Sequence, residues 1–167
     1  MFITSTGIVD GMIADRFGSR GEANGFDMPV VSMPLEFHDA PPNTASFAIF
    51  LEDKDAYPVS PGFSWVHWLA ANIAATSLPE DASRIAADDM VQGVNSWISA
   101  QGGYQPPEQC SFYGGMAPPD KAHLYDINVY ALDTLLDLDN GFFLNDLFHA
   151  MEGHVLDHAV LKAWYRP

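Results

Sequence analysis

The stretch HLYDINVYAL, residues His123–Leu132, decides the fold class because its side chains follow the two-residue period of a β-strand. Tyr125, Ile127 and Val129 fall on one face, and residues of more mixed polarity fall on the other. In a strand these two faces point in opposite directions. The stretch therefore predicts a long strand with one face in the protein core.

Other segments also have the pattern of strands. Ser46–Glu52 is nearly continuous in apolar residues and Ser64–Asn72 is similar, which is typical of strands buried on both faces. Ser32–Phe37 alternates between apolar and polar positions. The segment Gln101–Pro119 is rich in proline and glycine and predicts a long loop, which is either functional or a crossover between sheets.

One convincing helix begins near Asn140. Its apolar residues follow the spacing i, i+3, i+4, i+7 and are Leu144, Leu147, Phe148 and Met151. We expect this stripe to pack on the core. Several β segments and one late helix favour a mainly β fold, an antiparallel β-sandwich with a few peripheral helices, in one domain over residues 1–167.

The composition excludes several classes of partner and location. The chain has 167 residues with 22 acidic and 7 basic side chains, so its formal net charge is −15. Such a charge disfavours nucleic acid and anionic membrane surfaces, which bind clustered Lys and Arg. No apolar run is long enough to span a bilayer. The lone Cys110 cannot form an internal disulfide, and no signal peptide is recognisable before Arg16, so we expect a cytoplasmic protein.

Candidate site residues occur in three pairs with i, i+2 spacing, which places both members on one side of an extended chain. The pairs are Asp53 and Asp55, Trp65 and His67, and His123 and Tyr125. Pro118 and Pro119 precede the last pair and would hold the backbone rigid. Imidazole and phenol groups can donate to phosphate or carboxylate oxygens, and a carboxylate can orient a histidine or bind an ammonium group. Together they suit a small anion or zwitterion.

Each pair also has a purely structural interpretation. Two aspartates at a strand end are often a solvated turn. A tryptophan beside a histidine is often core packing with one polar tip. His154 and His158 have i, i+4 spacing but lack the H-E-x-x-H pattern of a zinc site, and Gly153 interrupts the predicted helix.

Three motifs together give the chain a family resemblance. They are D-K-D-A at Asp53–Ala56, W-V-H-W at Trp65–Trp68 and P-P-x-x-x-H-x-Y at Pro118–Tyr125. In this order and spacing they resemble the phosphatidylethanolamine-binding protein family, in its bacterial Raf-kinase-inhibitor-like branch. The resemblance implies an antiparallel β-sandwich with a small cavity that holds anions such as phosphate or acetate. It also implies that the eight residues of the three pairs and the two prolines form that cavity.

The sequence departs from the family pattern at three positions near the motifs. Lys54 stands where the family has proline, Leu124 where it has arginine, and Ala117 where it has glycine or cysteine. In a strand Leu124 points away from His123, so we expect the cavity residues themselves to be unaffected.

The sequence leads to two functional hypotheses. The first is a non-enzymatic binding protein for phosphate or phosphoethanolamine-like head groups, with His67 and His123 donating to the anion and with no cofactor or metal. The second is a small hydrolase or isomerase that uses the same aspartates and histidines, with or without a metal such as zinc or manganese. The resemblance adds a kinase or protease as a candidate protein partner, and a homodimer as a candidate assembly.

Overall fold

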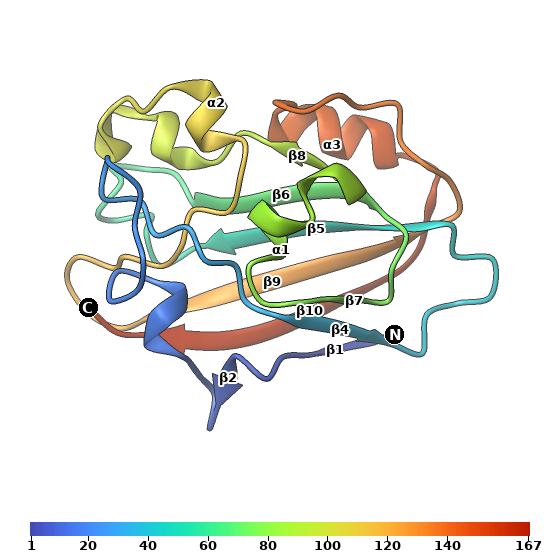
Figure 1. The fold of residues 1–167 in the computed structure, drawn as a ribbon, viewed down its shortest axis with the longest axis horizontal. Coiled ribbons are helices and arrows are strands. Elements are labelled where there is room, and N and C mark those ends of the chain that lie inside the picture. The colour runs from blue at the N-terminus through green and yellow to red at the C-terminus, as the bar shows by residue number, and fades with distance from the viewer.

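The computed structural model describes all 167 residues, and its largest element is a curled seven-stranded β-sheet (Figure 1). Its strands, in spatial order, are β2 (Ile8–Val9), β3 (Met12–Ile13), β10 (Val155–Tyr165), β9 (His123–Leu132), β5 (Ser46–Asp53), β6 (Trp65–Ile73) and β8 (Val91–Gly93). All neighbours are antiparallel except β10 and β3, which are parallel. The chain is therefore mainly β.

A smaller sheet covers one face of the large one. It contains β1 (Phe2–Thr4), β4 (Leu35–His38) and β7 (Ser77–Leu78), in the order β1-β4-β7 (Figure 1). Ile3 and Phe37 of this sheet join Phe47, Ile49 and Val129 of the large sheet in one buried cluster. The predicted sandwich is confirmed, with a second layer of only three short strands.

The opposite face of the large sheet is covered in part by helix α3 (Leu144–Met151). Leu147 and Met151 are buried against Ala48 and Leu132 in a second apolar cluster. The other helices are single turns: α1 (Ala82–Ile85), α2 (Pro107–Cys110), and the 3-10 turns η1 (Asp15–Phe17), η2 (Ala87–Asp89), η3 (Ser96–Ile98) and η4 (Ala100–Gly102). None of the helices combines the length and apolar character that crossing a bilayer needs.

The predicted strands at the sheet centre are confirmed as β5, β6 and β9, and the alternating segment Ser32–Phe37 overlaps β4. The helix begins at Leu144 rather than near Asn140, and Phe148 of its stripe is 42% exposed, with its ring edge against Phe50. The predicted loop Gln101–Pro119 contains α2. The sequence does not predict the longest strand, β10. Asp157, His158 and Lys162 lie among its apolar residues, so neither face of the strand reads as continuously apolar.

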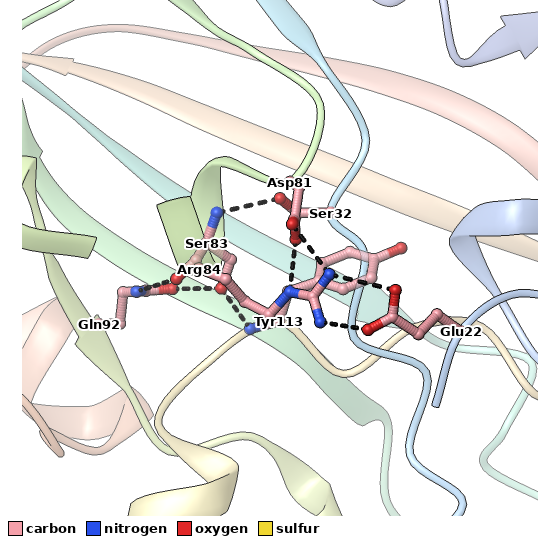
Figure 2. A network of polar contacts seen from close by, with 7 residues as sticks. All are labelled: Glu22, Ser32, Asp81, Ser83, Arg84, Gln92 and Tyr113. Carbon is pink, nitrogen blue, oxygen red and sulfur yellow. Dashed lines mark hydrogen bonds and ion pairs between the residues drawn. The ribbon is translucent and has the colours of Figure 1, made fainter. Parts of the chain in front are cut away.

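A polar network ties α1 to β8 and to the segment that leads into the cavity (Figure 2). The Ser83 hydroxyl donates to Gln92 Oε1 at 2.7 Å and accepts from the Tyr113 amide at 2.8 Å. Gln92 Nε2 donates back to the Ser83 carbonyl, and Gln92 Oε1 also accepts from the indole of Trp68 at 2.8 Å. On the outer side of the network, the Arg84 guanidinium forms ion pairs with Glu22 and Asp81. The segment that follows Tyr113 is thereby fixed against the sheet.

Candidate functional site

A cavity of about 240 Å³ lies at one edge of the large sheet. Strand β5 ends at this edge, and β6 and β9 begin there (Figure 1). Strand pairing brings the motifs together there, because Asp53 is the register partner of both Trp65 and Tyr125. The structure places seven of the eight predicted residues in the cavity wall: Asp53, Trp65, His67, Pro118, Pro119, His123 and Tyr125.

His123 is the charged centre of this group. It is fully buried, its Nδ1 lies 2.6 Å from Asp53 Oδ2, and its Nε2 lies 2.8 Å from Asp120 Oδ1. Burial alone would lower the pKa of His123, but the hydrogen bonds to Asp53 and Asp120 outweigh it, so the pKa is raised. A ring that donates to a carboxylate from each nitrogen carries both protons. His123 is thus an imidazolium.

His67 is held in the opposite state. Its Nδ1 donates to the Gly114 carbonyl at 2.6 Å, while the Gly114 amide donates to the His67 carbonyl at 2.8 Å. Complete burial lowers the pKa of His67 and outweighs the neighbouring charge of Asp53. The neutral ring carries its proton on Nδ1, which leaves Nε2 as an acceptor. Neither histidine therefore has an N–H free for an anion, in contrast to the expectation from sequence.

Asp55 lies outside the cavity wall. Strand β5 ends at Asp53 and the chain turns from Lys54 onward, so the interpretation that the two aspartates point to one side of an extended chain is wrong. The Asp55 carboxylate instead accepts from the Leu124 amide at 2.9 Å. It fastens the turn to the start of β9, beside His123.

Two donors in the cavity wall have no partner. The Tyr125 hydroxyl and the Trp97 indole Nε1 are both buried, and neither makes a hydrogen bond. Burial, and then the charge of Asp53, raises the pKa of Tyr125 well above its ordinary range, so the phenol keeps its proton. Buried polar groups are nearly always paired, so each exception calls for an explanation, such as a bound water, ion or ligand. These two groups are able to donate to a bound ligand.

Trp97 and Asp120 did not emerge from the sequence as site residues. Trp97 follows Asn95, whose side chain caps the turn η3, and its ring packs edge-on against Trp65 at 5.8 Å. Its position in the cavity depends on a long-range fold that no local motif reports. Asp120 had a local signal, because it lies three residues before His123 and directly after the two prolines. The remaining unpredicted wall residues are Ala56, Val59, Ser60, Gln101 and Ala117.

Comparison with known proteins identifies the family. The model of the phosphatidylethanolamine-binding protein family matches residues 4–166. The chain belongs to this family. A solved homologue from Chlamydia trachomatis superposes with a TM-score of 0.78 at 28% identity and covers 99% of this chain and 97% of its own. YbcL of Escherichia coli, described as a member of the mammalian family, gives a TM-score of 0.75 at 26% identity over 99% and 97%.

Two curated relatives are more similar in sequence. The uncharacterized protein YxkA of Bacillus subtilis is 47% identical over 130 residues, which are 77% of each chain. A UPF0098 protein of Methanothermobacter thermautotrophicus is 37% identical over 161 residues, which are 93% of this chain and 91% of the relative. The family and the fold are thus shown, and neither relative carries a described activity.

Two of the three departures from the usual motif, Lys54 and Leu124, lie away from the cavity. Lys54 faces the other side of the sheet, where its ammonium group pairs with Glu52 at 3.0 Å and with Asp126 at 2.7 Å. Lys162 also pairs with Asp126 at 2.9 Å. Leu124 offers its backbone amide to Asp55, and its side chain does not line the cavity. Only Ala117 is itself a wall residue.

No group of three or more His, Cys, Asp or Glu side chains is arranged to hold a metal ion. His154 lies in a turn and bonds Asp133, while His158 lies in β10 and stacks on Tyr130 with a centroid distance of 4.3 Å. The two histidines are therefore not on a common helix face. At the cavity, both nitrogens of His123 and Nδ1 of His67 already have partners.

Proposed function

We propose that this family member is a binding protein, not an enzyme, whose cavity takes the phosphate group of a small anionic or zwitterionic ligand. The buried His123 imidazolium beside two unpartnered donors, Tyr125 and Trp97, carries the proposal. An imidazolium and neutral donors in a low-dielectric cavity stabilise a negative charge more than they would in water. Pro118 and Pro119 keep the opposite wall rigid, which lowers the entropy cost of binding.

Phosphate fits the donors and acceptors of the cavity better than a purely accepting anion. Its oxygens can accept from the Tyr125 hydroxyl and the Trp97 indole, and from Nε2 of His123 once Asp120 is displaced. A phosphate oxygen that keeps its proton can donate to Nε2 of neutral His67. For a phosphoethanolamine-like ligand, the carboxylate of Asp120, which is 45% exposed, can exchange its bond to His123 for one to the ammonium group.

Isothermal titration of the protein with inorganic phosphate and with phosphoethanolamine tests the proposal. We expect saturable one-to-one binding of both, with NMR shift changes at His123 and Tyr125. His154→Ala is the matched control and should bind both ligands as the wild type does. It removes an exposed histidine outside the cavity that also pairs with a carboxylate. Absence of saturable binding, or binding that the loss of Tyr125 and Trp97 donors leaves unchanged, would overturn the proposal.

Anion affinity should fall as pH rises. The raised pKa of His123 keeps its charge above the ordinary value of about 6.5, and the charge is lost once pH passes that raised pKa. The lowered pKa of His67 means that it gains a proton only below about 6.5, which adds a donor there. The other ionisable groups facing His123 are Asp53, Asp120 and Tyr125.

This pH dependence is measured best with sulfate, whose charge stays constant over the range, between about pH 6 and about pH 9. Above the pKa of His123, the dissociation constant should rise by about tenfold for each pH unit. If NMR showed that His123 loses its charge within this range while the affinity stayed constant, the imidazolium would take no part in binding.

Tyr125→Phe should have opposite effects on binding and on stability. The lost hydroxyl is buried and unpaired, so the folded protein should gain about 1–3 kcal/mol or stay unchanged. Phosphate affinity should fall about tenfold, because a hydrogen bond to a charged ligand is lost. Titration and urea unfolding measure the two effects.

Tyr113→Phe is the control for this variant, because the Tyr113 hydroxyl donates to the Phe17 carbonyl at 2.7 Å. It should lose about 1 kcal/mol and leave phosphate binding unchanged. If Tyr125→Phe instead lost stability and bound phosphate normally, the hydroxyl would have a structural role.

The wider expectations from sequence stay predictions for this family member. They are a kinase or protease partner, a homodimer, a cytoplasmic location and a single domain over residues 1–167. No observation favours the hydrolase or isomerase alternative, and we do not propose it as a second function.

A further inference from the structure

The two carboxylates that bind His123 differ in their surroundings. Asp53 is buried, with a side chain 4% exposed, and its Oδ1 also accepts from the Ala56 amide at 3.1 Å. The Asp120 side chain is 45% exposed, and His123 is its only ion-pair partner. Asp53 is therefore a permanent partner of the imidazolium, whereas Asp120 can be released to water at small cost.

The geometry restricts how an anion can reach the imidazolium. A histidine ring has two N–H groups, and on His123 the Nδ1 proton belongs to Asp53. The remaining one, on Nε2, is bonded to Asp120 at 2.8 Å. Any anion that accepts a hydrogen bond from His123 must therefore displace the Asp120 carboxylate.

We propose that Asp120 is a built-in competitor for the imidazolium of His123 and that it selects dianionic phosphate over monocarboxylates. This inference rests on the proposed function, since it assumes an anion in the same cavity. Asp120 acts as a specificity residue, because its carboxylate already occupies the position at His123 Nε2 that the carboxylate of a ligand would take.

Selectivity follows from what each anion gains by the exchange. A monocarboxylate replaces one carboxylate by another on the same N–H, and it competes with a tethered group whose effective concentration is on the order of millimolar or higher. A phosphate dianion brings a second charge and further oxygens for the free donors of Tyr125 and Trp97. Only the second exchange has a clear net gain.

The test compares inorganic phosphate and acetate by isothermal titration at about pH 7, in wild-type protein and in Asp120→Ala and Asp120→Asn. NMR checks that the bond to Asp53 keeps His123 protonated in both variants. We expect both variants to bind both anions more tightly, with Ala having the larger effect because Asn keeps a neutral acceptor. Acetate should gain most, so that the preference for phosphate over acetate falls about tenfold. Asp139→Asn is the control, because Asp139 is exposed and its substitution changes the net charge by the same amount.

The possible outcomes separate this inference from the proposed function. Unchanged or weaker affinities in Asp120→Ala, with wild-type protein still binding phosphate, would overturn the competitor role and leave the proposed function intact. If neither wild-type nor variant protein bound either anion, while NMR showed the bond between His123 and Asp53 intact, both would fail. An equal gain in Asp139→Asn would show a general charge effect and overturn the competitor role.

Discussion

His123→Ala is expected to destabilise the protein by about 3–5 kcal/mol, because it leaves the Asp53 carboxylate buried without its cation. The two side chains are 0% and 4% exposed, and the bond between Nδ1 and Oδ2 is 2.6 Å long. Urea unfolding followed by tryptophan fluorescence measures the loss. Phosphate binding should disappear in the same variant, since the proposed charged donor is gone.

His154→Ala is again the matched control. His154 and Asp133 form an ion pair at 2.8 Å, but both side chains are nearly half exposed, so its loss should cost less than about 1 kcal/mol. The pH dependence supplies a second check. The raised pKa of His123 means that its stabilising effect is complete below about pH 6.5 and is lost as pH rises through the raised value.

The stability difference between wild type and His123→Ala should therefore narrow at high pH. The lowered pKa of His67 has the opposite effect, weakening both proteins as pH falls, and it largely cancels in the difference. A loss of stability no greater than that of His154→Ala would contradict a charged, buried pair.

The double variant Asp53→Asn with His123→Ala should lose less stability than the sum of the losses in the two single variants.

Gln92→Leu is expected to have the second largest effect, through the network in Figure 2. Gln92 is 2% exposed, and its Oε1 accepts from both the Trp68 indole and the Ser83 hydroxyl. Leucine has a similar volume but accepts nothing. Each of the two buried donors left unpaired costs about 1–3 kcal/mol, so we expect a total loss of about 2–6 kcal/mol in urea unfolding.

Gln109→Leu serves as the control for Gln92→Leu, because Gln109 is exposed and its substitution should change stability by no more than about 0.5 kcal/mol. Equal stabilities of the two variants would mean that water replaces the lost acceptor. The Tyr113 amide bonds Ser83, so the same change loosens the segment that carries Gly114 and holds His67. The polar network therefore helps to hold His67 in its position in the cavity wall.

The central strands could be predicted from the sequence because local physics determines them. Three strands are either continuously apolar or alternate with period two: Ser46–Asp53, Trp65–Ile73 and His123–Leu132. Both patterns can be recognised without knowledge of which segments the strands pack against. Strand β10 could not be predicted in this way. Its outward positions, which include Lys162 and Trp164, are exposed, so no clear apolar face appears in the sequence.

The sequence alone determined the family, the β architecture and seven of the thirteen residues that line the cavity, because motif order and strand period are encoded locally. Only the tertiary structure decided the state of each group. Complete burial makes His67 neutral, and two carboxylates from separate segments make His123 a cation. A turn at Lys54 takes Asp55 out of the cavity. The protonation state of a side chain and the direction in which it points depend on neighbours that are distant in sequence, and a local sequence pattern carries no information about them.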